Sequence, residues 1–212
     1  MSMPESWISF LGEGFREKLK KTLCEVDGEN VFPPATDRFR AFEVEPDEVK
    51  VVLLGQDPYP KRGQATGYAF AFDGAAEDCP HSLRVIRSHL RKQLGCEVSS
   101  TLDLRRWSSE GVLLLNTALT VAEGEPGSHL HVWEPITKRI LFNLASLEKP
   151  PVFALWGKKA QNLVSREDIL KRLCVCERHP VRWTKNCTPF KNIDDQVGVW
   201  FDKKIDWGSA CR

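Results

Sequence analysis

The chain has 212 residues, of which 42% are hydrophobic and 28% are charged, and its formal net charge at pH 7 is +1. These proportions exclude disordered and fibrous proteins, and the length fits a single domain over residues 1–212. No apolar run approaches the roughly 20 residues of a membrane-spanning helix, so we expect no membrane contact. Because the net charge is so small, nucleic acid could be bound only through a local basic patch.

The seven cysteines show no disulfide or metal pattern. Their number is odd and no two are spaced as C-x-x-C, which argues against a disulfide framework, a zinc ribbon and an iron–sulfur cluster. We therefore expect no metal and no cofactor. A reducing, intracellular compartment follows, the cytoplasm in a bacterium or the nucleus in a eukaryote. Cys174 and Cys176 lie two apart in an apolar run and are predicted to be small core residues of a strand.

The hydrophobic pattern alternates between helical and strand periods along the chain. An opening segment has apolar residues near a helical period, namely Trp7, Phe10, Leu11, Phe15, Leu19 and Leu23. Four short apolar runs then predict strands at 49–54, 112–115, 152–155 and 173–176. Helical patterns separate them, one from Leu83 to Leu94 and another ending at Leu147 that begins near Glu134 and Pro135. Strands that alternate with helices predict an α/β fold with a parallel sheet.

Polar side chains directly follow all four predicted strands. In chain order they are Gln56, Asp57 and Tyr59, then Asn116, then Lys158 and Lys159, then His179. The carboxyl ends of parallel strands meet at one edge of a sheet, where ligands bind in open α/β folds. Each residue also has a plain structural explanation, since Gln56-Asp57-Pro58 could build a tight turn and Asn116 could be a turn former. Four such strand ends together favour a functional site.

These motifs resemble those of the family 1 uracil-DNA glycosylases over nearly the whole chain. The segments that carry the resemblance are Gly55-Gln56-Asp57-Pro58-Tyr59, Gly67-Tyr68-Ala69-Phe70, Leu113 to Val121, Leu155-Trp156-Gly157 and His179-Pro180. Five motifs in the family's order are highly specific. The resemblance implies a three-layer α/β/α sandwich around a four-stranded parallel sheet. It also implies an enzyme that hydrolyses the N-glycosidic bond of uracil in DNA and leaves an abasic site.

The resemblance implies catalytic roles for Asp57 and His179. Breaking an N-glycosidic bond builds positive charge on the sugar and negative charge on the departing base. A carboxylate such as Asp57 can stabilise the cationic sugar and orient the attacking water, and an imidazole such as His179 can donate a hydrogen bond to the base oxygen.

Four further residues are implied in uracil binding. The amide of Asn116 can match uracil's N3–H and O4, and Gln56 can hold a carbonyl edge of the base. Phe70 would stack on the flipped base, and Tyr59 would exclude the 5-methyl group of thymine. Phe70 also has an alternative as a core aromatic, because large residues alternate from Tyr68 onward as they do in a strand.

A DNA-binding rim is implied as well, made of Pro60, Ser82, Gly157, Lys158, Pro180, Arg182, Trp183 and Thr184. The chain departs from the family's pattern at Pro60, where the family has a histidine, and at Lys158, where it has a serine. Lys158 favours ionic contacts with phosphate, and Lys159, Arg182 and Lys185 would make the rim more basic.

The loop after His179 departs furthest from the pattern. Val181, Arg182 and Trp183 stand where the family has a small polar residue, a second proline and an intercalating leucine. One hypothesis makes Trp183 the wedge that fills the gap left by the flipped nucleotide, which requires an exposed indole. The alternative is a core tryptophan, with Arg182 as the other candidate wedge.

The leading hypothesis is thus a monofunctional DNA-repair enzyme of base excision that acts on uracil in single- or double-stranded DNA. Two alternatives stay open: a glycosylase of the same fold for another deaminated base, and a non-catalytic glycosylase-like DNA-binding accessory factor. The presence of Tyr59 and Asn116 argues against the first, and that of Asp57 and His179 against the second. We expect a monomer, and a proteinaceous glycosylase inhibitor is a further candidate partner.

Overall fold

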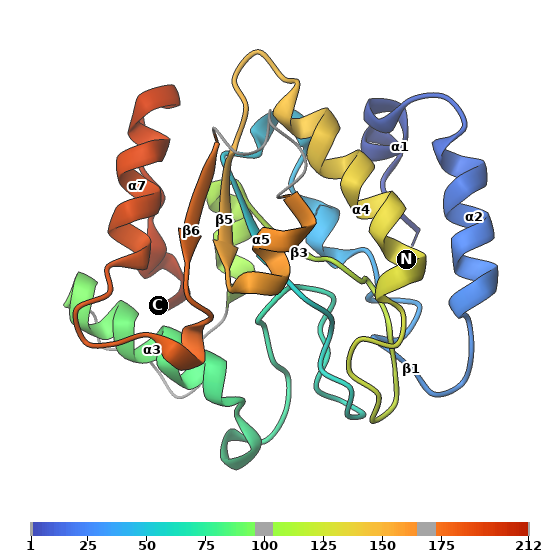
Figure 1. Ribbon diagram of the computed structural model, residues 1–212, viewed down its shortest axis with the longest axis horizontal. Helices are drawn as coiled ribbons and strands as arrows, with labels where there is room; N and C mark the ends of the chain where they lie inside the picture. Colours follow the sequence, from blue (N-terminus) through green and yellow to red (C-terminus); the bar gives the residue numbers. More distant parts are fainter. Residues whose placement is uncertain (1, 96–103, 165–172, 212) are drawn as a thin grey trace.

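The computed structural model in Figure 1 describes residues 2–95, 104–164 and 173–211. Its centre is a four-stranded parallel sheet in the order β3-β2-β5-β6. The strands are β2 (Val51–Gly55), β3 (Val112–Asn116), β5 (Val152–Trp156) and β6 (Cys174–Glu177). The predicted α/β/α sandwich around a four-stranded parallel sheet is confirmed.

The register of the sheet brings the chemistry of two strands together. β2 pairs with β3 from Val51↔Val112 to Gly55↔Asn116, and it pairs on its other side with β5. Every residue of β2, β3 and β5 is buried, as expected for strands that have helices on both faces. The aligned ends of β2 and β3 place residues 55–57 beside Asn116.

The edge strand β6 corrects the prediction for its cysteines. Cys174 is only partly buried and Cys176 is exposed, so the expected pair of core cysteines is wrong. β6 has a single neighbour, β5, in the sheet, and the apolar run therefore lies at the sheet edge. Cys96 lies outside the described residues.

Helices cover the two faces of the sheet as separate layers (Figure 1). One layer contains α1 (Glu5–Leu11), α2 (Phe15–Val26), α4 (Leu130–Ala145) and α5 (Lys158–Val164). The other contains α3 (His81–Leu94) and α7 (Pro189–Trp200), with the 3-10 helices η4 (Leu104–Glu110) and η6 (Trp207–Cys211). The remaining 3-10 helices are η1 (Arg40–Glu43), η2 (Pro46–Glu48), η3 (Ala76–Asp78) and η5 (Pro180–Arg182).

Two helix boundaries differ from the sequence-based expectation. The opening amphipathic segment forms two helices because the backbone turns at Gly12 and Gly14, both with positive φ. Helix α4 begins at Leu130 rather than near Glu134, and Pro135 lies inside it. Pro135 is the sixth residue of α4, past the first turn, and it lacks the backbone N–H that would otherwise donate to the His131 carbonyl.

A small antiparallel ladder was not expected from the sequence. It joins β1 (Val31–Phe32) to β4 (Val121–Ala122), and Glu123 N–H donates to the Asn30 carbonyl (2.8 Å). The ladder fixes the start of the loop at 123–129, in which the Gly127 N–H donates to Asp57. Among the residues that the structure describes, no helix is long and apolar enough to cross a membrane.

Candidate active site

A cavity of about 250 Å³ lies at the carboxyl ends of β2 and β3. Residues from four separated segments line it: Gln56, Asp57, Tyr59 and Pro60 after β2, Phe70 and Ser82 from the following connection and α3, Asn116 from β3, and His179 after β6. The structure thus brings together all six residues that the sequence analysis assigned to catalysis and uracil binding. Within the described ranges, no three His, Cys, Asp or Glu side chains gather as a metal site requires.

Asp57 is held by the loop at 123–129. The backbone N–H of Gly127 donates a hydrogen bond to Asp57 Oδ2. Partial burial raises the pKa of Asp57, and the Gly127 hydrogen bond, the charge of Lys159 and a hydrogen bond from Gln56 oppose that rise. The carboxylate is therefore poorly solvated yet fixed in direction, an arrangement that can stabilise a positive charge in the cavity.

His179 is oriented by its own loop and by Gly157. Gly157 has φ +111°, and a Cβ there would lie 3.0 Å from His179 Cβ, so glycine permits the close approach of the two loops. Val181 N–H donates to His179 Nδ1 (3.4 Å). Partial burial and the nearby charge of Arg182 lower the pKa of His179. A neutral imidazole that accepts at Nδ1 carries its proton on Nε2, which makes Nε2 a donor.

Asn116 is packed against the backbone of the neighbouring strand. Its side chain is only 6% exposed, and a Cβ at Gly55 would clash with Asn116 Oδ1. The absence of a side chain at Gly55 thus makes the space in which the amide lies. Thr117 fixes the same strand end, because both its N–H and its hydroxyl donate to the Gly55 carbonyl (3.0 and 3.1 Å).

Phe70 and Tyr59, two of the aromatic residues that line the cavity, contact each other. Phe70 has φ +63°, and its ring centroid lies 5.5 Å from that of Trp156 and 6.5 Å from that of His179. The segment around Phe70 is irregular, so the core-strand alternative for this residue is wrong. The Tyr59 hydroxyl donates to the Phe70 carbonyl (3.4 Å), and burial raises the Tyr59 pKa to about 12.

The residues assigned to the DNA-binding rim, apart from Trp183, fall into three groups. Lys158 at the start of α5, Arg182 in η5 and the following Thr184 are exposed, whereas Pro60 and Ser82 line the cavity itself. Ser82 forms a hydrogen bond with Tyr59 rather than facing outward. Gly157 and Pro180 are buried and shape the loops.

Trp183 contradicts the expectation of an exposed indole. Its side chain is 9% exposed, and its Nε1–H donates to the Arg178 carbonyl (2.6 Å). The ring packs edge to face against Trp156 and His89, with centroids 4.7 and 5.1 Å away. The same loop exposes Val181 instead, at 44%. A large ring next to an aromatic core gains more from burial than from water, so Trp183 packs inward.

Gly127 is the site residue that the sequence analysis missed. Its contribution is a backbone N–H, which leaves no signal in the residue type, and it lies far from Asp57 along the chain. Lys159, expected only as part of the basic rim, lies close enough to influence the charge of Asp57.

An α/β sandwich that gathers a carboxylate, an imidazole and an amide at its strand ends suits an enzyme that releases a nucleobase. The family model described as "Uracil DNA glycosylase superfamily" matches residues 42–202. The chain belongs to this superfamily.

Curated relatives match along nearly the whole chain. A uracil-DNA glycosylase of Fusobacterium nucleatum is 38% identical, with 95% of this chain and 94% of the relative covered. A uracil-DNA glycosylase of Bacillus subtilis is 34% identical, with 97% of this chain and 96% of the relative covered. The crystal structure of mimivirus uracil-DNA glycosylase has the same fold, with a TM-score of 0.78, 22% identity, and 97% of this chain and 87% of that chain covered.

Proposed function

We propose that this protein excises uracil from DNA by hydrolysing the N-glycosidic bond, with Asp57 and His179 as its catalytic residues. The observation that carries the proposal is the 250 Å³ cavity on which Asp57, Asn116, Phe70 and His179 converge. Membership of the superfamily supports it, as do the names of the curated relatives.

In this proposal Asp57 acts on the sugar side of the bond. As the bond lengthens, positive charge spreads over the deoxyribose, and the Asp57 carboxylate stabilises that charge and orients the attacking water. The Gly127 N–H keeps the carboxylate in place. Because water is partly excluded from the cavity, the attraction between the Asp57 carboxylate and the cationic sugar is stronger than it would be in bulk solvent.

His179 acts on the departing base. Its pKa is lowered, so the imidazole is neutral at neutral pH, and the Val181 N–H occupies Nδ1. Nε2–H can then donate to the uracil oxygen on which negative charge collects. This hydrogen bond strengthens as the bond breaks, which makes it a transition-state interaction.

Base choice follows from shape and from hydrogen-bond pattern. The Asn116 amide pairs with the edge of uracil, and cytosine would leave buried groups unpaired at about 1–3 kcal/mol per group. Phe70 stacks on the face of the base. Tyr59, held by its hydroxyl contacts, closes the space that the 5-methyl group of thymine would need.

Lys158, Arg182 and Val181 would meet the DNA. The two cations would bind phosphates, and Val181, the exposed apolar residue of η5, would take the wedge role that burial denies to Trp183. A mimivirus relative in fold was crystallised in complex with UGI, which supports a proteinaceous inhibitor as a partner of this chain too. The bacterial relatives support an intracellular location, the bacterial cytoplasm.

An excision assay tests the proposal directly. Oligonucleotides that carry uracil, hypoxanthine, xanthine or a thymine mispair are incubated with the protein and then cleaved with alkali at abasic sites. We expect cleavage of the uracil strand alone. Cleavage of another strand in preference would favour a different base, and no cleavage at all would favour an accessory factor.

Asp57→Asn is the matched variant for this assay. It should lower the single-turnover rate by orders of magnitude while binding to uracil-containing DNA is kept. The folded protein holds the Asp57 proton more tightly than the unfolded chain does, so the ionised carboxylate costs stability above its folded pKa. The melting temperature of Asp57→Asn at pH 7 should thus not fall. A rate loss below about tenfold, roughly 1.4 kcal/mol, would remove Asp57 from the central role.

A further inference from the structure

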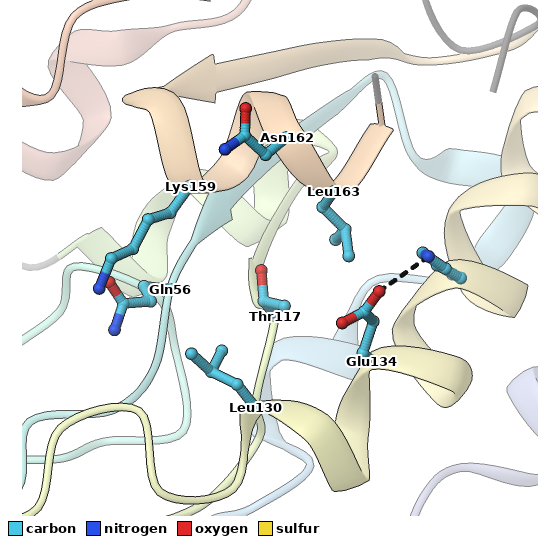
Figure 2. Close-up of a pocket in the computed structure, with 8 residues that line it drawn as sticks. Gln56, Thr117, Leu130, Glu134, Lys159, Asn162 and Leu163 are labelled. Atoms are coloured by element: carbon cyan, nitrogen blue, oxygen red, sulfur yellow. Dashed lines mark ion pairs between the residues drawn. The ribbon is translucent and has the colours of Figure 1, made fainter. Parts of the chain in front are cut away.

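A second cavity, of about 530 Å³, lies directly beside the uracil pocket. Figure 2 shows it between α5, which carries Lys159 and Leu163, and the start of α4, which carries Leu130. Gln56 lines both cavities. The two spaces are therefore neighbours across this one side chain, and the proposed uracil chemistry makes no use of the second.

The walls of this cavity combine apolar, polar and cationic groups. Leu130 and Leu163 offer apolar surface from two different helices, and Thr117 is a buried hydroxyl at the end of β3 (Figure 2). At one end, Lys138 is paired with Glu134 (2.8 Å), so these two charges cancel. At the other end, the exposed Lys159 has no ion-pair partner within 4.0 Å in the described parts of the chain. The cavity thus has one net positive charge, on the side of the uracil pocket.

We propose that this cavity binds the nucleotide next to the target uracil in single-stranded DNA, with its base between Leu130 and Leu163 and its phosphate toward Lys159. This inference rests on the proposed function. A nucleobase has two apolar faces and a polar edge, which fits apolar walls around polar groups, and a cation beside the base fits its phosphate. Adjacent nucleotides are joined by one phosphodiester, which fits two cavities separated by one side chain.

The same site would be closed to duplex DNA. A paired neighbour stays stacked in the helix, and extracting a second base would cost a few kcal/mol more. In a single strand the neighbouring base has no partner to leave. The cavity should therefore raise activity on single strands alone, which separates this role from general phosphate binding along the rim.

The test uses single-stranded oligonucleotides in which one base next to uracil is replaced by a tetrahydrofuran spacer. The spacer removes the base but keeps the phosphate, and it is placed on the 5′ side or on the 3′ side. For the unmodified protein, kcat/KM should fall about tenfold with the spacer on one of the two sides, because the apolar surface of one base would no longer be buried against the two leucines.

Leu163→Trp fills the cavity from α5 without touching the catalytic residues. We expect this variant to excise uracil from the intact single strand at the rate seen with the spacer, and to show no further loss when the spacer is present. Its activity on duplex uracil should be unchanged. Leu147→Trp, a partly buried position beyond the end of α4, is the matched control and should behave like the unmodified protein.

If Leu163→Trp has a lowered melting temperature, Asn162→Glu replaces it, because this exposed residue lines the cavity and the new charge would repel a phosphate. Equal excision from intact and spacer strands by the unmodified protein would overturn the inference and leave the proposed function standing. Parallel losses on single and double strands in both variants would also overturn it. Failure to excise uracil from any strand would instead overturn the proposed function.

Discussion

At the scale of single residues, partial burial moves the pKa values of Asp57 and His179 toward each other. The pKa of Asp57 is raised and that of His179 is lowered, since each charged form loses hydration in the cavity. The state proposed for catalysis is an ionised Asp57 beside a neutral His179, and the lowered pKa of His179 favours its neutral form. Acid removes it, because both groups take up protons.

The first prediction concerns this pH dependence. Activity should fall with decreasing pH between 6.5 and 3.8, the ordinary pKa values of the two groups, because one value is lowered and the other raised. Lys159→Met removes a positive charge that lowers the Asp57 pKa. The acid side of the profile of activity against pH should therefore move to higher pH. Single-turnover rates across this range measure the shift. Lys149→Met, an exposed position before β5, is the control, and an unmoved acid side in Lys159→Met would contradict the proposed coupling.

The second prediction concerns the choice between uracil and thymine. Tyr59→Ala removes the ring that stands against the 5-methyl group and should permit thymine excision. Selectivity based on one methyl group is worth about 1–3 kcal/mol, so the gain should be about 10- to 200-fold in the ratio of thymine to uracil excision. Competition assays with thymine and uracil strands give this ratio. An unchanged ratio would show that Tyr59 does not set the specificity.

At the scale of elements, the loop after β6 divides its residues between core and surface. Trp183 packs against Trp156 and Phe190, and η5 turns Val181 and Arg182 outward. Phe70 contacts the same Trp156, so the aromatic cluster supports the wall on which the base would stack. A substitution of Trp183 should thus reduce activity by destabilising the fold.

The third prediction follows from this packing. Trp183→Ala should lower the free energy of unfolding by about 3–5 kcal/mol and reduce activity on single- and double-stranded uracil alike. Val181→Ser should leave the melting temperature unchanged and reduce activity on duplex DNA more than on single strands. Thermal melts with rates on both substrates separate the two effects. A stable Trp183→Ala protein that lost only duplex activity would restore Trp183 as the wedge.

At the scale of the whole molecule, the formal charge of +1 gives no general attraction to DNA. The attraction must come from cations placed around the cavity, and Lys158 is the most direct candidate because it is exposed at the first residue of α5. DNA would therefore be attracted only to the face of the protein that carries the cavity.

The fourth prediction tests this local patch. Lys158→Ala should weaken DNA binding and reduce the slope of log K against log salt concentration by about one, the value for one lost phosphate contact. Titrations of uracil-free DNA at several salt concentrations provide the slope. Lys20→Ala, a lysine of α2 in an exposed ion pair, is the control and should leave the slope unchanged. Equal slopes for Lys158→Ala and the unmodified protein would exclude the contact.

Hydrophobic pattern alone predicted the parallel sheet and the strand-end residues Gln56, Asp57, Tyr59, Asn116 and His179, whereas Phe70 was selected only by the resemblance to the glycosylase family. Continuous apolar runs predict buried parallel strands, and strand polarity then requires their following residues to meet, as Asp57, Asn116 and His179 do. These inferences depend on the local hydrophobic pattern, which the residue types report directly.

Which surfaces are buried and which backbone groups meet depends on how the elements pack together. A tryptophan or a cysteine can lie inside or outside a core. The burial of Trp183 and the exposure of Cys176 therefore depend on which elements pack against them. The Gly127 N–H on Asp57 and the cavity between α4 and α5 arise between segments distant along the chain. Packing between elements has no local signature, because it depends on the shape of the partner surface as much as on the residue itself.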